Sequence, residues 1–78
     1  MLKRENVIEA IKKNVLGFDI GRIENDEQNL LEAGLDSLDH ASVLLTLEEE
    51  HGISFPDEVA GELVTIQAIM NHANAASS

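Results

Sequence analysis

The positions of apolar residues along the chain predict helices rather than strands. The segment from about residue 3 to residue 16 has apolar residues at helical spacing, and Gly17 directly after it is a residue type that ends helices. This apolar stripe consists of Val7, Ile8, Ile11 and Val15. Apolar and polar residues nowhere alternate over strand length, and the run Gly52–Phe55 is too short to support a sheet. We therefore expect an all-α fold.

A second helix is predicted over Ser37–His51, because Asp36 is a favourable N-cap residue and Gly52 follows the last turn. Its apolar residues spread too widely for one stripe. On the helical wheel they form a row of Leu38, Ala41 and Leu45, and an adjoining arc of Val43, Leu44 and Leu47. A helix this broadly apolar is either central to the core or has a second apolar face for a partner, and both can hold.

Two further helices complete the prediction. A short helix is expected at about residues 57–62 after Pro56, and a last main helix at about residues 65–73 with Thr65 as its cap. The end of the chain, about residues 74–78, is expected to be a disordered tail.

Residues 17–35 form a long connection for a small domain, and loops of this length are uncommon in compact folds and often functional. Asn29 and Glu32 have the spacing of a capping box, so a helical turn is expected near residues 29–33. Apolar residues within the connection are expected to hold it to the core. These residues are Phe18, Ile20, Ile23, Leu30, Leu31 and Leu35.

The composition limits the size and class of the protein. The chain has 78 residues, of which 44% are hydrophobic, enough for one modest core and a single domain over residues 1–78. It has no Cys, which excludes disulfides and thiolate metal sites. No apolar run reaches the length of a membrane span, and the first residues lack the apolar stretch of a signal peptide. We therefore expect a cytoplasmic monomer without a membrane span.

The charges are unevenly distributed. The net charge is −10, and every Lys and Arg lies at or before Arg22. Such a surface repels nucleic-acid phosphates and anionic lipid headgroups. It attracts proteins with a basic patch and speeds their encounter. We expect partners with basic docking patches and no nucleic acid, and the alternative that the acids only keep the protein soluble stays open.

Few residues indicate catalysis. His40, His51 and His72 lack the spacing of a helical zinc pair, so no metal site is expected. Ser37 and His40 are three residues apart beside Asp36, which suggests a hydrolase triad on paper. A chain of this length has little room for an oxyanion hole and a substrate pocket. We therefore expect that the protein is not an enzyme.

The most informative segment is Gly34-Leu35-Asp36-Ser37-Leu38. Here the chain resembles the acyl carrier protein family, including the related peptidyl carrier domains, whose hallmark is a Gly-x-Asp-Ser-Leu motif at the start of the second helix. Further matches follow in order and at matching spacings. They are Leu47–Glu50, Phe55–Glu58 and Val64–Ile66. The chain is therefore identified as similar to a free-standing bacterial-type acyl carrier protein.

The resemblance implies a small four-helix bundle whose Ser37 receives 4′-phosphopantetheine from coenzyme A. The thiol of this arm holds an acyl group as a thioester and delivers it to partner enzymes. The implied partners are a phosphopantetheinyl transferase and acyl-transferring or synthase enzymes with basic docking patches. The implied partner-binding residues are Asp36, Leu38, Asp39, Ala41, Leu45, Glu48 and Glu49. The resemblance makes Leu38, Ala41 and Leu45 an exposed apolar row and leaves Val43, Leu44 and Leu47 for the core. A competing interpretation places Leu45 in the core.

Some positions depart from the fatty-acid carriers of that family. Ser42 stands where those carriers usually have Glu, and Leu31–Ser37 resembles the form frequent in polyketide and non-ribosomal-peptide carriers. We therefore expect a role in fatty-acid, polyketide or another specialised acyl pathway, with a specialised pathway at least as well supported as housekeeping fatty-acid synthesis. Two alternatives stay open: an aminoacyl or peptidyl carrier, and a small acidic interaction module without a covalent cofactor.

Overall fold

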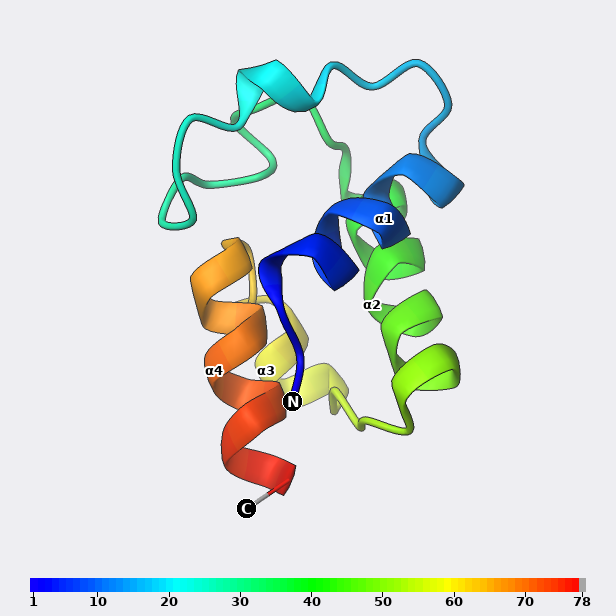
Figure 1. Cartoon of the computed structure of the whole chain (residues 1–78), viewed down its shortest axis with the longest axis vertical. Helices are drawn as coiled ribbons and strands as arrows, with labels where there is room; N and C mark the ends of the chain where they lie inside the picture. Colours follow the sequence, from blue (N-terminus) through cyan, green and yellow to red (C-terminus); the bar gives the residue numbers. More distant parts are fainter. Residues whose placement is uncertain (78) are drawn as a thin grey trace.

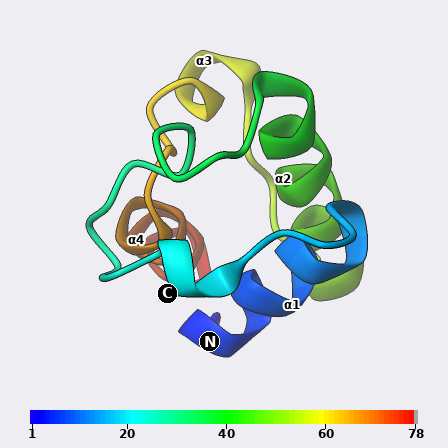
Figure 2. The same cartoon turned by 90° about the horizontal axis from the view of Figure 1, so that it is seen from above.

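The computed structural model describes the backbone of residues 1–77 and the side chains of residues 1–75. The order of elements is α1 (Arg4–Asn14), the 3-10 helix η1 (Ile20–Arg22), α2 (Ser37–His51), α3 (Asp57–Ala60) and α4 (Ile66–Ser77), as Figure 1 shows. No strand occurs in residues 1–77, and the all-α prediction is confirmed. In both Figure 1 and Figure 2, α1, α2 and α4 surround the core and the long connection crosses one end.

Helix α2 begins and ends where the sequence predicts. At its start, Asp36 has an extended backbone and its carboxylate Oδ1 accepts a hydrogen bond from the backbone N–H of Asp39 at 2.8 Å. At its end, Gly52 adopts the left-handed conformation with φ of 66°, and its N–H donates to the carbonyl of Glu48 at 3.0 Å. Both signals are local, which explains why they could be identified in the sequence.

The core lies between α1, α2 and α4, and residues of the long connection close it. On α2 the predicted arc of Val43, Leu44 and Leu47 is buried, which confirms its assignment to the core. Burying these side chains is the main source of stability in a domain of this size. The largest fully buried side chains are Ile11, Leu30, Leu47, Ile66, Ile69, Val7 and Val43.

The second half of the long connection is held by backbone hydrogen bonds to the residues around the start of α4. The predicted helical turn near residues 29–33 is a hydrogen-bonded turn, in which Asn29 Oδ1 accepts from the N–H of Leu31 at 2.8 Å. The buried Leu30 donates its N–H to the carbonyl of Val64 at 2.7 Å. Asp26 offers its carbonyl to the N–H of Gln67 at 2.9 Å. Within the turn, the N–H of Ala33 also donates to the carbonyl of Asn29 at 3.1 Å, so the tertiary bonds add to one helical turn of local hydrogen bonds.

Helix α4 continues past the predicted end at residue 73. The tail expected to be disordered is helical as far as Ser77, and residue 78 lies outside the described residues. One cause is Asn74, whose Oδ1 accepts from the N–H of Leu2 at 2.9 Å and whose Nδ2 donates to the Leu2 carbonyl at 3.3 Å. The two ends of the described chain are therefore bound to each other. The predicted short helix, in contrast, ends early, at Ala60.

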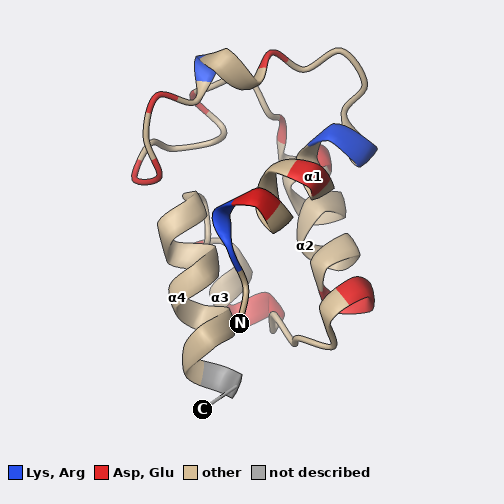
Figure 3. Cartoon of the chain, in the orientation of Figure 1, with Lys and Arg blue, Asp and Glu red and all other residues tan. Residues whose placement is uncertain are grey.

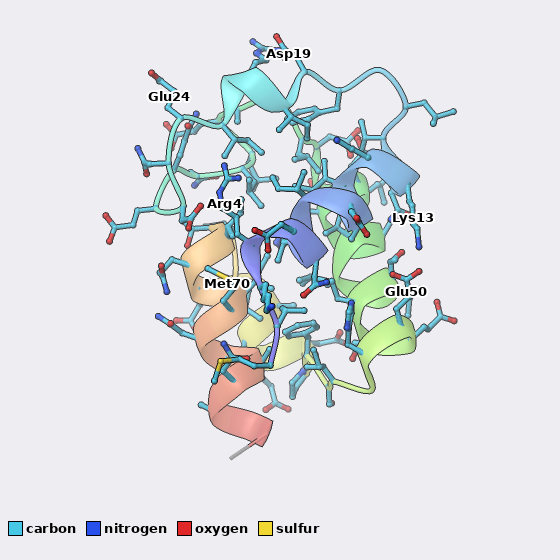
Figure 4. All side chains as sticks on the ribbon, in the orientation of Figure 1. Arg4, Lys13, Asp19, Glu24, Glu50 and Met70 are labelled. Atoms are coloured by element: carbon cyan, nitrogen blue, oxygen red, sulfur yellow. The ribbon has the colours of Figure 1, made fainter. Side chains whose placement is uncertain are left out.

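The charged residues of the described chain are concentrated outside α4, as Figure 3 shows. Arg4 pairs with Asp26 at 2.6 Å. Lys13 of α1 pairs with Glu50 of α2, as Figure 4 shows. The hydrogen bond and the negative charge of Glu50 raise the pKa of the Lys13 amine above its usual value of 10.5. Among the described residues, no helix has both the length and the apolar character needed to cross a membrane.

Candidate functional site

Ser37 is the first residue of α2, and its side chain is exposed. The chain reaches it through the long connection and turns into the helix at Asp36. The Ser37 hydroxyl makes no hydrogen bond within the described residues. A reagent or enzyme in solution therefore has direct access to this nucleophile.

The backbone at the start of α2 has unused donors. The N–H of Asp39 is occupied by the Asp36 carboxylate, and the N–H of His40 donates to the Asp36 carbonyl at 2.9 Å. The N–H groups of Ser37 and Leu38 have no acceptor within residues 1–77. Free N–H groups and the positive end of the helix dipole favour an anion at this place. The carboxylates of Asp36 and Asp39 oppose this preference by repulsion.

Glycine is required immediately before this turn. Gly34 has φ of +121°, a conformation that residues with a side chain rarely adopt. A Cβ at this position would lie 3.1 Å from Nη1 of Arg22 and 3.4 Å from Cε2 of Phe18. The glycine of the Gly-Leu-Asp-Ser segment therefore allows the connection to pack closely just ahead of Ser37.

His40 does not form a catalytic triad with Ser37. Its side chain is buried, with 7% exposed, and its Nε2 lies 2.6 Å from the backbone carbonyl of Leu63. A carbonyl oxygen only accepts, so Nε2 carries a proton and donates it to this bond. The imidazole therefore points into the protein as a structural donor. This role was not predicted from the sequence. The signal was the position of His40, because a residue three positions before Val43 lies on the same face of the helix as the buried arc.

The expected apolar row is on the surface. Leu38 is 80% exposed and Leu45 is 55% exposed, and Ala41 between them is also exposed. The competing assignment of Leu45 to the core is therefore wrong. Exposed leucines one above the other on a helix form an apolar stripe that is costly in water unless a partner covers it.

The acidic residues beside this row differ in their environment. Asp36 and Glu49 are exposed, whereas Asp39 and Glu48 are half-buried. Glu48 Oε2 accepts a hydrogen bond from the backbone N–H of Phe55 at 2.8 Å, a structural role that the sequence did not reveal. No cluster of three or more metal-ligating residues occurs within the described residues.

Comparison with known families agrees with this geometry. The family model described as "Phosphopantetheine attachment site" matches residues 6–73. The chain therefore belongs to the phosphopantetheine attachment site family, and the predicted resemblance to acyl carrier proteins is confirmed at this level. The protein is a carrier whose cofactor is covalently attached 4′-phosphopantetheine. No solved structure matches the chain significantly.

The start of α2 fits this cofactor. The Ser37 hydroxyl is exposed, and the adjacent N–H groups of Ser37 and Leu38 have no acceptor within the described chain, so a phosphodiester could face them here. Domains of this kind are not themselves catalytic, and they interact with partner enzymes.

Proposed function

We propose that this protein is an acyl carrier protein and that Ser37 is the attachment residue for 4′-phosphopantetheine. The observation that carries the proposal is the exposed hydroxyl of Ser37 on the first residue of α2, within the segment matched by the family model. When bound, the arm supplies a thiol that holds an acyl group as a thioester. A tethered thioester reaches the active site of a docked enzyme at high effective concentration.

The chain's own contribution to the loading reaction is presentation of the nucleophile. The base that accepts the Ser37 proton comes from the transferase, because the imidazole of His40 is buried and donates to Leu63. The Asp36 carboxylate caps α2 by accepting a hydrogen bond from the N–H of Asp39, and this cap keeps Ser37 at a defined helix start. We infer that the protein itself performs no catalytic step.

The proposed docking surface comprises the apolar row and the acidic residues around it. Leu38, Ala41 and Leu45 contribute apolar area, and Asp36, Asp39 and Glu49 contribute charge toward a basic partner patch. Glu48 belongs to this surface as well, but its bond to Phe55 gives it a structural role in addition. The absence of an anion at Ser42 leaves the middle of the face less charged than its two ends.

The pathway is proposed from the sequence departures. The exposed Ser42 and the Gly-Leu-Asp-Ser segment favour a polyketide or another specialised acyl pathway at least as much as fatty-acid synthesis. We propose an acyl cargo in preference to an aminoacyl or peptidyl cargo. Cytoplasmic location, a monomeric state, a single domain and the lack of nucleic-acid partners stay predictions from the sequence.

The proposal is tested by intact mass after incubation with coenzyme A and a broad-specificity phosphopantetheinyl transferase. We expect one phosphopantetheine on the wild type and none on Ser37→Ala. Ser42→Ala is the matched control, because Ser42 is an exposed serine on the same helix and its loss should leave loading intact. Addition to Ser37→Ala would place the attachment at another residue. A folded, unmodified wild type that accepts no group from several transferases would favour an interaction module without the cofactor.

A further inference from the structure

On α2, His40 lies between Ser37 and the buried apolar arc. It follows Ser37 by three positions and is the first buried side chain of that helix. On the helical wheel it lies on the same side as Val43, Leu44 and Leu47, at the end nearest Ser37. The buried face of α2 therefore begins, next to the attachment residue, with an imidazole and not with an aliphatic side chain.

The imidazole is also fixed to the opposite side of the molecule. Its Nε2–H donates to the carbonyl of Leu63 at 2.6 Å, and Leu63 is itself buried. Leu63 lies in the segment between α3 and α4, which faces α2 across the middle of the molecule in both Figure 1 and Figure 2. The short helix α3 before it has no buried residue of its own. The His40 bond is thus a direct link between the first turns of α2 and this segment.

A cargo attached through Ser37 would have to break this link to enter the core next to the attachment residue. A hydrocarbon chain gains free energy by leaving water, and the gain grows with each methylene group. Entry between α2 and Leu63 would leave the Leu63 carbonyl and the His40 N–H without their partners, in an apolar surrounding that cannot replace them. The cost is independent of chain length, so it weighs most against short cargo and keeps polar cargo in solvent.

We infer that His40 closes the route from Ser37 into the core to short and polar acyl groups, which this carrier therefore holds in solvent. The inference rests on the proposed attachment at Ser37. It assigns to His40 a role in cargo selection, through its position and its bond to Leu63, and no role in the chemistry of loading.

The test compares acetyl and hexanoyl forms, made by transfer of the corresponding acyl-phosphopantetheine from acyl-coenzyme A to the protein. Two properties are measured: the melting temperature and the rate at which hydroxylamine cleaves the thioester. For the wild type we expect the two forms to melt together and to be cleaved at the same rate. For His40→Ala we expect the hexanoyl form to melt about 4 °C or more above the acetyl form. Its cleavage should also be slower, because a buried thioester reacts only after local opening.

Three further variants control this comparison. His72→Ala also removes a histidine bond to a backbone carbonyl, from Nε2 to Ser54 at 3.2 Å, but on α4 and away from the buried arc of α2. It should behave as the wild type does. His40→Gln keeps an N–H donor for Leu63 and should also resemble the wild type. His40→Leu fills the space without a donor and should resemble His40→Ala, so it preserves the comparison if His40→Ala does not fold.

The wild type alone is sufficient to overturn the inference. A hexanoyl form that melts higher and resists hydroxylamine in the wild type would show that His40 does not exclude short chains. Equal behaviour of the hexanoyl forms of wild type and His40→Ala would show that another feature keeps cargo in solvent. Failure to attach any arm at Ser37 is a separate result, visible in the intact mass, and it would refute the proposed function itself.

Discussion

The carboxylate of Glu48 accepts a hydrogen bond from the backbone N–H of Phe55 at 2.8 Å, which ties the last turn of α2 to the loop that leads into α3. The neighbouring Glu49 is exposed and has no such bond among the described residues. Two adjacent glutamates of the same helix therefore differ in environment. Glu48 has a structural bond, and we propose that Glu49 contributes only its charge to the docking surface.

This difference predicts that substitutions of the two glutamates affect the free energy of unfolding to different extents. Glu48→Ala should lower the free energy of unfolding by about 1–3 kcal/mol, because the half-buried N–H of Phe55 loses a charged acceptor. Glu49→Ala should change it by less than about 0.5 kcal/mol. Urea unfolding measures both values. In transferase kinetics, Glu49→Ala should raise the KM for the carrier. Equal stability of the two variants would contradict the structural role of Glu48.

Asp36 combines a cap with a charge, and two substitutions separate them. Asp36→Ala removes the acceptor for the Asp39 N–H and should cost about 1 kcal/mol of stability. Asp36→Asn keeps an oxygen acceptor and should retain most of the stability, but it removes the charge toward a basic partner. We therefore expect both variants to raise the KM of the transferase and only the alanine variant to unfold at clearly lower urea. An asparagine variant as unstable as the alanine variant would refute the capping role.

The end of α2 depends on the left-handed conformation of Gly52. Gly52→Ala should destabilise the protein by about 1–2 kcal/mol, because φ of 66° is strained for alanine although no atom lies within 4 Å of the added Cβ. Gly61 is the matched control, with φ of −67° and the same open space. Gly61→Ala should be neutral or stabilise by up to about 1 kcal/mol. Thermal unfolding monitored by circular dichroism compares the two, and equal destabilisation would count against the strain argument.

The excess of acidic residues predicts a fold that depends on ionic strength. The chain carries 15 Asp and Glu residues against 5 Lys and Arg residues. Two ion pairs, Arg4–Asp26 and Lys13–Glu50, engage bases of α1. Added salt weakens these exposed pairs slightly but screens the more numerous repulsions. We therefore expect the melting temperature to rise between low and moderate concentrations of sodium chloride. A melting temperature that stays constant or falls over this range would contradict the prediction.

Several features could be predicted because their causes are local in the chain. Asp36 and Gly52 act on backbone groups within one or two turns, so the boundaries of α2 follow from residue type and position. The division of α2 into a buried arc and an exposed apolar row follows from helical geometry. The exposure of Ser37 follows from the N-cap at Asp36 and from the helical geometry of α2. The family match covers the motif that contains Ser37.

Other features were decided only by the tertiary structure. Glu48, His40 and Asn74 each bond to a backbone group, at sequence separations of 7, 23 and 72 residues. Every residue other than proline offers the same backbone N–H and every residue the same carbonyl, so no residue type marks Phe55, Leu63 or Leu2 as the partner. The sequence alone determined which helices form and which face of α2 is apolar. Packing of α1, α2 and α4 decided which backbone groups these side chains meet, because only the folded chain brings distant segments within hydrogen-bond distance.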